Sequence, residues 1–138
     1  MDLYSRRIVG WAVASTQDTT LVLAALQMAI GRRQPAAGLL HHSDRGSQYA
    51  SAPYQTVLQA YRFTVSMSDT GNCFDNAAME SFFGTLKAER INRQSYPTRD
   101  QARQDIVSYI EGFYNITRRH STLGYRSPLE FEQASAMA

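Results

Sequence analysis

Short apolar runs alternate with longer helix-forming stretches along most of the chain, and this order restricts the fold more than any other feature. The predicted strands are residues 8–14, 39–42 and 63–66, and the predicted helices are residues 19–33, 53–61, 76–90, about 98–113 and a last short helix from Ser127–Pro128. Strands that alternate with helices in this way favour an α/β layer with parallel strands. No internal repeat or interdomain linker interrupts the order.

The predicted first helix is preceded by Asp18, a good N-cap residue, and we expect Gly31 to stop it. It is apolar on nearly every side, so we expect it to be largely buried. In the later helix Thr98 and Gln101 form the pattern of a capping box. The core-facing stripe of that helix consists of Ala102, Ile106, Tyr109, Ile110 and Phe113.

The start of the chain resembles the tip of a hairpin. Residues 2–4 are typical of the end of a strand that turns directly into the strand predicted at residues 8–14. We therefore expect that an N-terminal part, including the partner strand, precedes this segment in the complete domain.

Composition narrows the class of protein. The 138 residues suffice for one ordinary domain, and 43% hydrophobic with 19% charged residues is typical of a globular chain. The net charge of only +2 does not by itself indicate a nucleic-acid binder. A single cysteine, Cys73, excludes an internal disulfide. With no signal peptide and no apolar run long enough to span a bilayer, we expect a cytoplasmic protein without a membrane partner.

Asp44 is the first candidate for chemistry. It follows the predicted strand at residues 39–42, and ligands of α/β sheets gather at the carboxyl ends of strands. The alternative, equally weighted on spacing alone, is that Asp44 caps a turn or the following helix.

Glu80 is the second candidate. It lies one turn into the helix predicted at residues 76–90, beside the core stripe, with Gly84 and Lys87 on its own face. Glycine between an acid and a lysine leaves room for a bulky ligand such as a DNA backbone. Taken alone, an ordinary solvated helix face explains these residues better.

Together, the two carboxylates are stronger evidence for a catalytic site than either one is alone. Hard divalent ions prefer carboxylate oxygens, and phosphodiester transfer commonly uses two such ions about 3.5–4 Å apart. Lysine beyond the acid can then position a phosphate as a point charge. Asp44 and Glu80 are thus candidate ligands of Mg²⁺ or Mn²⁺, and 35 residues lie between them.

Three segments resemble the integrase-type core of insertion-sequence transposases, a family similar in fold to retroviral integrases and ribonuclease H. They are HHSDRGSQY, SMSDTGNCFDNAAMESFFGTLKAE and FYNITRRHSTLGYRSPLEF. The resemblance implies a ribonuclease H-like three-layer α/β fold with a mixed sheet over residues 1–138, with residues 98–138 as a C-terminal helical extension. It also implies catalytic roles for Asp44, Glu80 and Lys87, which match the second and third acids of the family and its lysine. The first aspartate of the family has no counterpart here, and Asp2 matches a non-catalytic position.

A local excess of basic residues suits contacts to phosphates. Between Thr85 and Arg126 there are eight Lys or Arg residues against four acids. The predicted DNA-binding residues are Lys87, Arg90, Arg118, Arg119 and Arg126, although solvated helix faces explain such counts too.

Three histidines and one motif have weaker assignments. His120 is a possible metal ligand, but a role in packing is favoured. His41 and His42 could hold the residues of the site in position without contacting the ligand, but a role in packing is again favoured. Tyr125, Pro128 and Phe131 resemble a family motif that closes the C-terminal side of the domain.

The leading hypothesis is a metal-dependent polynucleotidyl transferase core that cleaves transposon ends and joins 3′ hydroxyls to target DNA, as a homo-oligomer or with full-length transposase. The first alternative is a non-enzymatic fragment that binds DNA or full-length transposase, which the missing first acid favours for this chain by itself. The second alternative is a ribonuclease H-like nuclease that cuts without strand transfer, which the lysine and the C-terminal motif disfavour.

Overall fold

The computed structural model describes residues 1–67 and 77–137, and the chain divides into two compact units. We call residues 9–77 the strand unit, and residues 1–8 with 78–138 the helical unit. This division does not follow the sequence-based one, in which residues 98–138 form an extension of a single domain, and that assignment stays a prediction.

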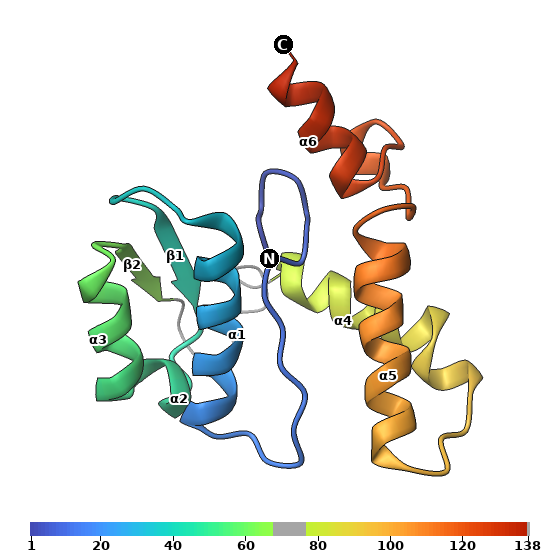
Figure 1. Ribbon diagram of the computed structural model, residues 1–138, viewed down its shortest axis with the longest axis horizontal. Helices are drawn as coiled ribbons and strands as arrows, with labels where there is room; N and C mark the ends of the chain where they lie inside the picture. The colour runs from blue at the N-terminus through green and yellow to red at the C-terminus, as the bar shows by residue number, and fades with distance from the viewer. Residues whose placement is uncertain (68–76, 138) are drawn as a thin grey trace. The chain divides into compact units, whose positions relative to one another are not determined.

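The strand unit contains a two-stranded parallel sheet flanked by helices (Figure 1). Its elements are α1 (Thr19–Arg33), β1 (Leu40–Ser43), α2 (Ser47–Ala50), α3 (Ala52–Ala60) and β2 (Thr64–Met67). Leu40 pairs with Thr64, and Ser43 pairs with Met67. The predicted parallel pairing is therefore confirmed, with each strand shifted by one residue from its expected position.

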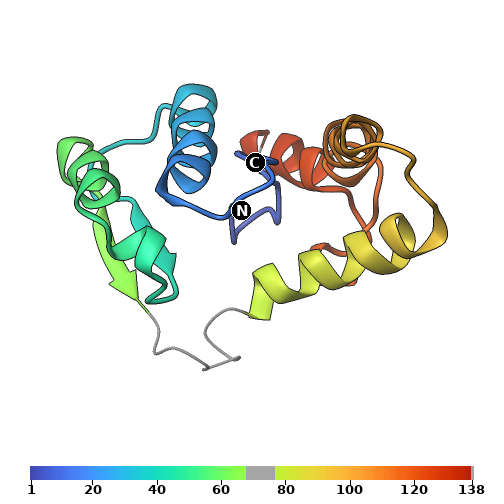
Figure 2. The same cartoon turned by 90° about the horizontal axis from the view of Figure 1, so that it is seen from below.

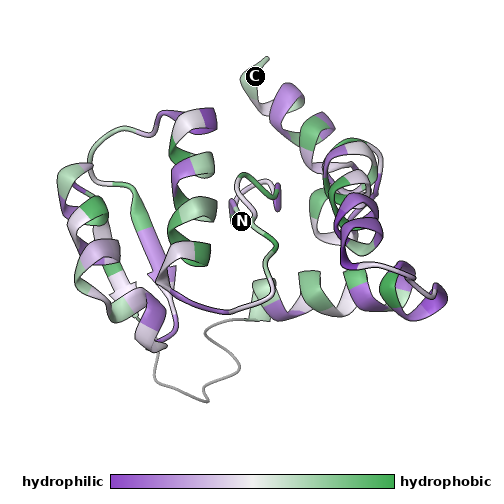
Figure 3. Cartoon of the chain, turned by 60° about the horizontal axis from the view of Figure 1, so that its bottom comes forward, coloured by the Kyte–Doolittle hydropathy of each residue, from purple (hydrophilic) through white to green (hydrophobic). Residues whose placement is uncertain are grey.

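The core of the strand unit lies between α1 and α3. Leu26 and Ile30 on α1, and Tyr54 and Leu58 on α3, are each one helical turn apart and buried. The remaining residues of α1 are intermediate or exposed, and Figure 3 shows polar and apolar residues mixed along it. The prediction that this helix is largely buried is wrong, because only Leu26 and Ile30 of its residues are buried.

The segment predicted as the strand 8–14 has no strand hydrogen bonding among the described residues, so this prediction is also wrong. A strand requires a hydrogen-bonded neighbour, and in the described part of the chain β1 and β2 pair only with each other. The segment instead passes close against α1 at Gly10, where an added Cβ would lie 2.2 Å from the Ala25 carbonyl oxygen. Glycine is therefore required at this position.

Contrary to the expectation, α1 does not end at Gly31. The helix continues to Arg33 and ends at Gln34, whose backbone is left-handed with φ 46° and whose N–H donates to the Ile30 carbonyl. Because Pro35 follows and cannot continue the hydrogen bonding, the helix ends there. Asp18 is the N-cap as predicted and accepts from the Leu21 N–H.

The helical unit contains mainly helices (Figure 2). They are α4 (Ala77–Glu89), η1 (Ile91–Arg93), α5 (Arg99–Tyr109), η2 (Ile110–Tyr114), η3 (Ser121–Leu123) and α6 (Pro128–Ala136). Thr98 caps α5 by accepting from the Gln101 N–H, while Ser127 and Glu130 form a complete capping box on α6. The predicted start of α4 at residue 76 lies outside the described residues, as does Cys73.

A π-helical turn, η2, places Asn115 inside the helical unit. The Asn115 N–H donates to Ile110, five residues back, and this wider turn buries both Tyr114 and Asn115. The Asn115 side chain exchanges two hydrogen bonds with the backbone of Ile8, of 2.8 Å and 2.9 Å. The Asn115 side chain therefore satisfies the N–H and the carbonyl of Ile8, as the backbone of a neighbouring strand would.

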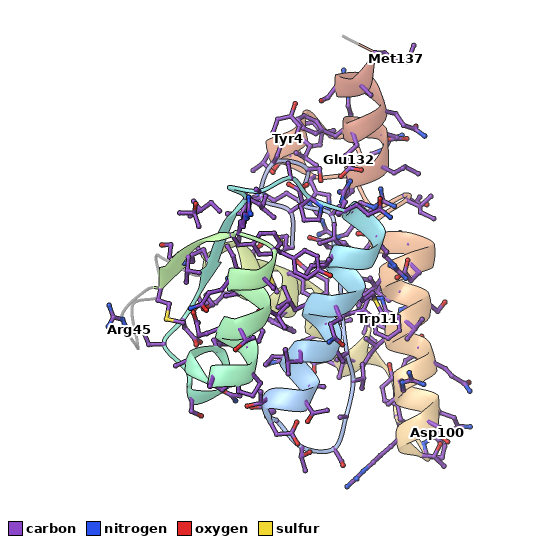
Figure 4. The ribbon with its side chains drawn as sticks, turned by 60° about the vertical axis from the view of Figure 1, so that its left-hand side comes forward. Tyr4, Trp11, Arg45, Asp100, Glu132 and Met137 are labelled. Carbon is purple, nitrogen blue, oxygen red and sulfur yellow. The ribbon has the colours of Figure 1, made fainter. Side chains whose placement is uncertain are left out.

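The N-terminal turn is attached to α6 by polar contacts. Ser5 and Arg7 each donate to the carboxylate of Glu132, at 2.7 Å and 2.8 Å, and the Tyr4 hydroxyl lies 2.8 Å from that of Ser135. Figure 4 shows Tyr4 and Glu132 close together at this contact. Among the described residues, no helix combines the length and apolar character needed to cross a membrane.

Candidate active site

Asp44 directly follows β1 and is exposed. Its Oδ1 accepts a hydrogen bond of 2.7 Å from the N–H of Gly46, the residue that precedes α2. A Cβ at Gly46 would lie 2.9 Å from both Asp44 Oδ1 and Gln48 Oε1, so a larger residue there would make these side chains shift. The turn-capping role that we weighed for Asp44 is therefore real, and it fixes the carboxylate at the end of the strand.

The residues around Asp44 form a tyrosine- and histidine-rich cluster in the strand unit. His41 Nε2 lies 2.9 Å from the Tyr54 hydroxyl, and Tyr49 packs edge-on to Tyr54. Burial lowers the pKa of His41, while burial and then the charge of Asp44 raise the pKa of Tyr49. His42 Nδ1 lies 3.0 Å from the Ser66 hydroxyl across the sheet. The histidines thus hold neighbouring elements together, as the packing alternative predicted.

Glu80 and Lys87 lie on α4 in the other unit, and both are exposed. Phe82 and Leu86 are the buried residues of this helix. Nothing lies within 4 Å of a Cβ built at Gly84, so the face between the acid and the lysine is open in the described structure. The structure thus brings Glu80 and Lys87 onto one helix, with Asp44 in the strand unit.

The helix α4 is held by its contacts with the C-terminal part of the helical unit. The Phe82 ring packs edge-on against Tyr114, with 4.9 Å between ring centroids. At the C-terminal end, Glu89 accepts from Arg118 Nε at 3.0 Å and from the Tyr109 hydroxyl at 2.7 Å. Sequence reasoning did not find this network, because Glu89 and Arg118 are 29 positions apart and no periodicity links them.

Burial and the neighbouring groups have opposite effects on the pKa of Glu89. Burial raises its pKa, but the hydrogen bonds from Arg118 and Tyr109 outweigh burial and hold the pKa below its ordinary value. The same contact offsets the effect of burial on Arg118 and raises the pKa of its guanidinium. The ion pair is therefore charged at neutral pH.

The predicted DNA-binding residues fall into two groups. Arg90 is paired with Asp105 at 2.6 Å, and Arg118 is paired with Glu89 at 3.0 Å. The second group, of exposed residues, is Lys87, Arg119 and Arg126. His120 pairs with Arg126 in an antiparallel bridge, and its ring packs edge-on against Tyr114.

Among residues 1–67 and 77–137, no group of three or more His, Cys, Asp or Glu side chains is arranged to hold a metal ion. The donor chemistry nevertheless fits a hard divalent cation, because Asp44 and Glu80 both present exposed carboxylates. His120 belongs to no such group, and its role as a ligand stays a weak prediction.

The family follows from comparison with known domains. Models described as "Integrase core domain" match residues 1–73 and 61–128. The chain belongs to the integrase core domain family. The family resemblance predicted from the three sequence segments is thereby confirmed.

Curated relatives are transposases or products of insertion elements. The chain is 47% identical to the "Transposase for insertion sequence element IS904" of Lactococcus lactis subsp. lactis over 96% of its length, and covers 53% of that protein. It is 46% identical to the insertion element IS600 uncharacterized 31 kDa protein of Shigella sonnei and 43% identical to the transposase InsF for insertion sequence IS3A of Escherichia coli K12, again over 96% of the chain. These matches cover 48% and 46% of the relatives, so the chain spans about half their length.

A solved structure supports the fold. The integrase core chain resembles a chain of the simian T-cell lymphotropic virus intasome, solved in complex with PP2A regulatory subunit B56 gamma, with a TM-score of 0.64 and 14% identity. The match covers 86% of this chain and 41% of that one. The α/β ribonuclease H-like fold class predicted from the sequence is confirmed.

Proposed function

We propose that this chain supplies Asp44, Glu80 and Lys87 to the active site of a metal-dependent polynucleotidyl transferase. Such an enzyme cleaves transposon ends and joins their 3′ hydroxyls to target DNA. The observation that carries the proposal is the arrangement of two acids with 35 residues between them, and a lysine seven positions after the second acid, in a chain of the integrase core family. The exposure of all three side chains supports it, because each must reach DNA or a metal ion.

Asp44 and Glu80 would hold Mg²⁺ or Mn²⁺, which supplies activation of the attacking hydroxyl and stabilisation of the leaving oxygen when bound. Their oxygens are the ligands these ions prefer. The hydrogen bond from the Gly46 N–H orients the Asp44 carboxylate. The open face at Gly84 gives a DNA strand room beside Glu80.

Lys87 would bind a phosphate as a point charge one to two turns beyond Glu80 on α4. Arg119 and Arg126, both exposed, would extend these sequence-independent contacts along the backbone. Arg90 and Arg118 stay predicted contacts, although each already has an acidic partner within the chain. The partners in this proposal are transposon ends and target DNA, with further copies of the chain or full-length transposase, in the bacterial cytoplasm.

A chimera tests the proposal with the rest of a transposase supplied. The matched segment of the Escherichia coli IS3A transposase, 43% identical, is replaced by this chain, and cleavage and joining of transposon ends are measured. We expect activity in Mg²⁺ that Asp44→Asn or Glu80→Gln abolishes, with Asp100→Asn as the control for loss of an exposed carboxylate. A folded chimera that binds the ends but never cleaves them would contradict the catalytic proposal and favour the non-enzymatic alternative.

A further inference from the structure

A small pocket in the helical unit lies where the C-terminal end of α4 and η1 meet the end of α5 and the π-helical turn η2. Its volume is about 280 Å³, and its lining consists of Glu89, Arg90, Arg93, Tyr109 and Phe113. Pockets that hold drug-sized ligands have volumes of about 300–1,000 Å³. This one therefore suits one small planar group, and a duplex cannot enter it.

Two flat surfaces line the pocket. The Arg90 guanidinium lies over the Tyr109 ring, 5.4 Å from its centroid. The Phe113 ring packs against Tyr109 at 5.6 Å with an interplanar angle of 46°. Tyr109 is buried and supports both, whereas Phe113 is 36% exposed and can be reached by a ligand. Arginine guanidinium planes and aromatic rings are the groups on which nucleobases stack.

Three of the described residues that line the pocket are charged, and Arg93 is the one that makes no salt bridge within the described part of the chain. Arg90 is neutralised by Asp105 at 2.6 Å, and Glu89 is neutralised by Arg118 at 3.0 Å. Arg93 is exposed, and its Nε donates to the Ala88 carbonyl oxygen at 3.0 Å. This bond anchors the guanidinium beside the pocket while keeping its positive charge, which suits a phosphate group.

We propose that this pocket binds a single unpaired nucleotide of a DNA strand, with its base stacked on Phe113 and Arg90 and its phosphate on Arg93. The inference rests on the proposed function in one respect, namely that the chain binds DNA. Arg90 lies ten residues after Glu80, which is about 15 Å along the axis of α4. A strand that runs along α4 with a rise of about 3.4 Å per nucleotide would place this nucleotide about four or five positions from the carboxylate of Glu80.

The experiment compares the affinity of the 138-residue chain for two labelled DNA hairpins, one blunt and one with a short single-stranded 3′ overhang that carries the fluorescent base 2-aminopurine. We expect tighter binding of the overhang and a change in its fluorescence, because the base leaves its neighbours in the strand when it stacks on Phe113. Phe113→Leu should reduce the preference for the overhang at least about five-fold, the lower end of stacking on an aromatic side chain, and Arg93→Ala should reduce it by removing the phosphate contact. Phe113→Tyr should restore it.

The control is Arg103→Ala, which removes an exposed arginine of α5 that does not line the pocket. It should weaken both hairpins alike and leave the preference unchanged. Equal binding of both hairpins, or a preference that survives Phe113→Leu, would overturn the pocket proposal and leave the proposed function standing. Failure to bind either hairpin would overturn both.

Discussion

The strand unit packs an apolar core between two helices, whereas the helical unit combines buried apolar and aromatic side chains with buried polar contacts. In the strand unit, Leu26 and Ile30 lie one helical turn apart on α1, and Tyr54 and Leu58 lie one turn apart on α3. All four residues are buried. In the helical unit the fully enclosed contacts include Asn115 with the Ile8 backbone. The strand unit, which contains Asp44, is therefore closed by packing within residues 9–77, while the helical unit, which contains Glu80 and Lys87, also joins the start of the chain to its C-terminal part through the hydrogen bonds of Asn115 with Ile8.

The largest effect should come from the core of the strand unit. Leu58→Ala removes a side chain with no exposed surface and leaves a cavity, so we expect a loss of about 2–5 kcal/mol in the free energy of unfolding. Amide hydrogen exchange should accelerate in α1, β1 and β2. Leu40→Ala, at a 63% exposed position, is the matched control and should have little effect. Equal acceleration in α5 would break the distinction between the units.

A smaller effect should come from Asn115→Ala in the helical unit. The variant leaves the buried N–H and carbonyl of Ile8 without their partner, and we expect a cost of about 1–3 kcal/mol. The exchange of the Ile8 amide and of α6 amides should accelerate while that of β1 and β2 does not. Asn92→Ala, an exposed asparagine in η1, controls for the loss of an amide side chain. Unchanged exchange at Ile8 in the Asn115 variant would show that the contact is dispensable.

The smallest effect concerns the ion pair at the end of α4. Because the folded-state pKa of Glu89 lies below its ordinary value of 4.5, the pair stabilises the helical unit above that pH. The stabilisation should disappear as the pH falls below about 4.5 and through the folded-state pKa. With side chains 24% and 35% exposed, we expect roughly 0.2–1 kcal/mol.

Denaturant unfolding at neutral and acid pH measures this contribution. Glu89→Gln should remove the part of the pH dependence that the pair causes, and Arg118→Gln should remove the same part. The double variant should therefore lose less than the sum of the two single losses. Strict additivity would show that the two residues act independently.

Local patterns predicted the parts of the fold that depend on neighbouring residues. The parallel strands at Leu40–Ser43 and Thr64–Met67 and the N-caps Asp18 and Thr98 are of this kind. The segment 8–14 has the composition of a strand, but composition cannot supply the neighbouring strand that pairing requires.

The candidate site also has parts that the sequence predicts and parts that it does not. The spacing of Asp44, Glu80 and Lys87 is visible in the sequence, and the family it indicated is confirmed. The support behind it, such as Glu89 with Arg118, joins residues 29 positions apart through side-chain hydrogen bonds. Neither charge counts nor periodicity contains that information, because many arginines of the segment could pair with Glu89 equally well.

The most direct test of the account is whether Asp44 and Glu80 bind one and the same metal site. A ¹⁵N-labelled chain is titrated with substoichiometric Mn²⁺, and the paramagnetic broadening of each amide signal is recorded. The account predicts broadening around Asp44 and Glu80 together, and loss of both sets of effects in Asp44→Asn as well as in Glu80→Gln, with Asp100→Asn unchanged. Broadening around Glu80 that persists undiminished in Asp44→Asn would contradict the shared site.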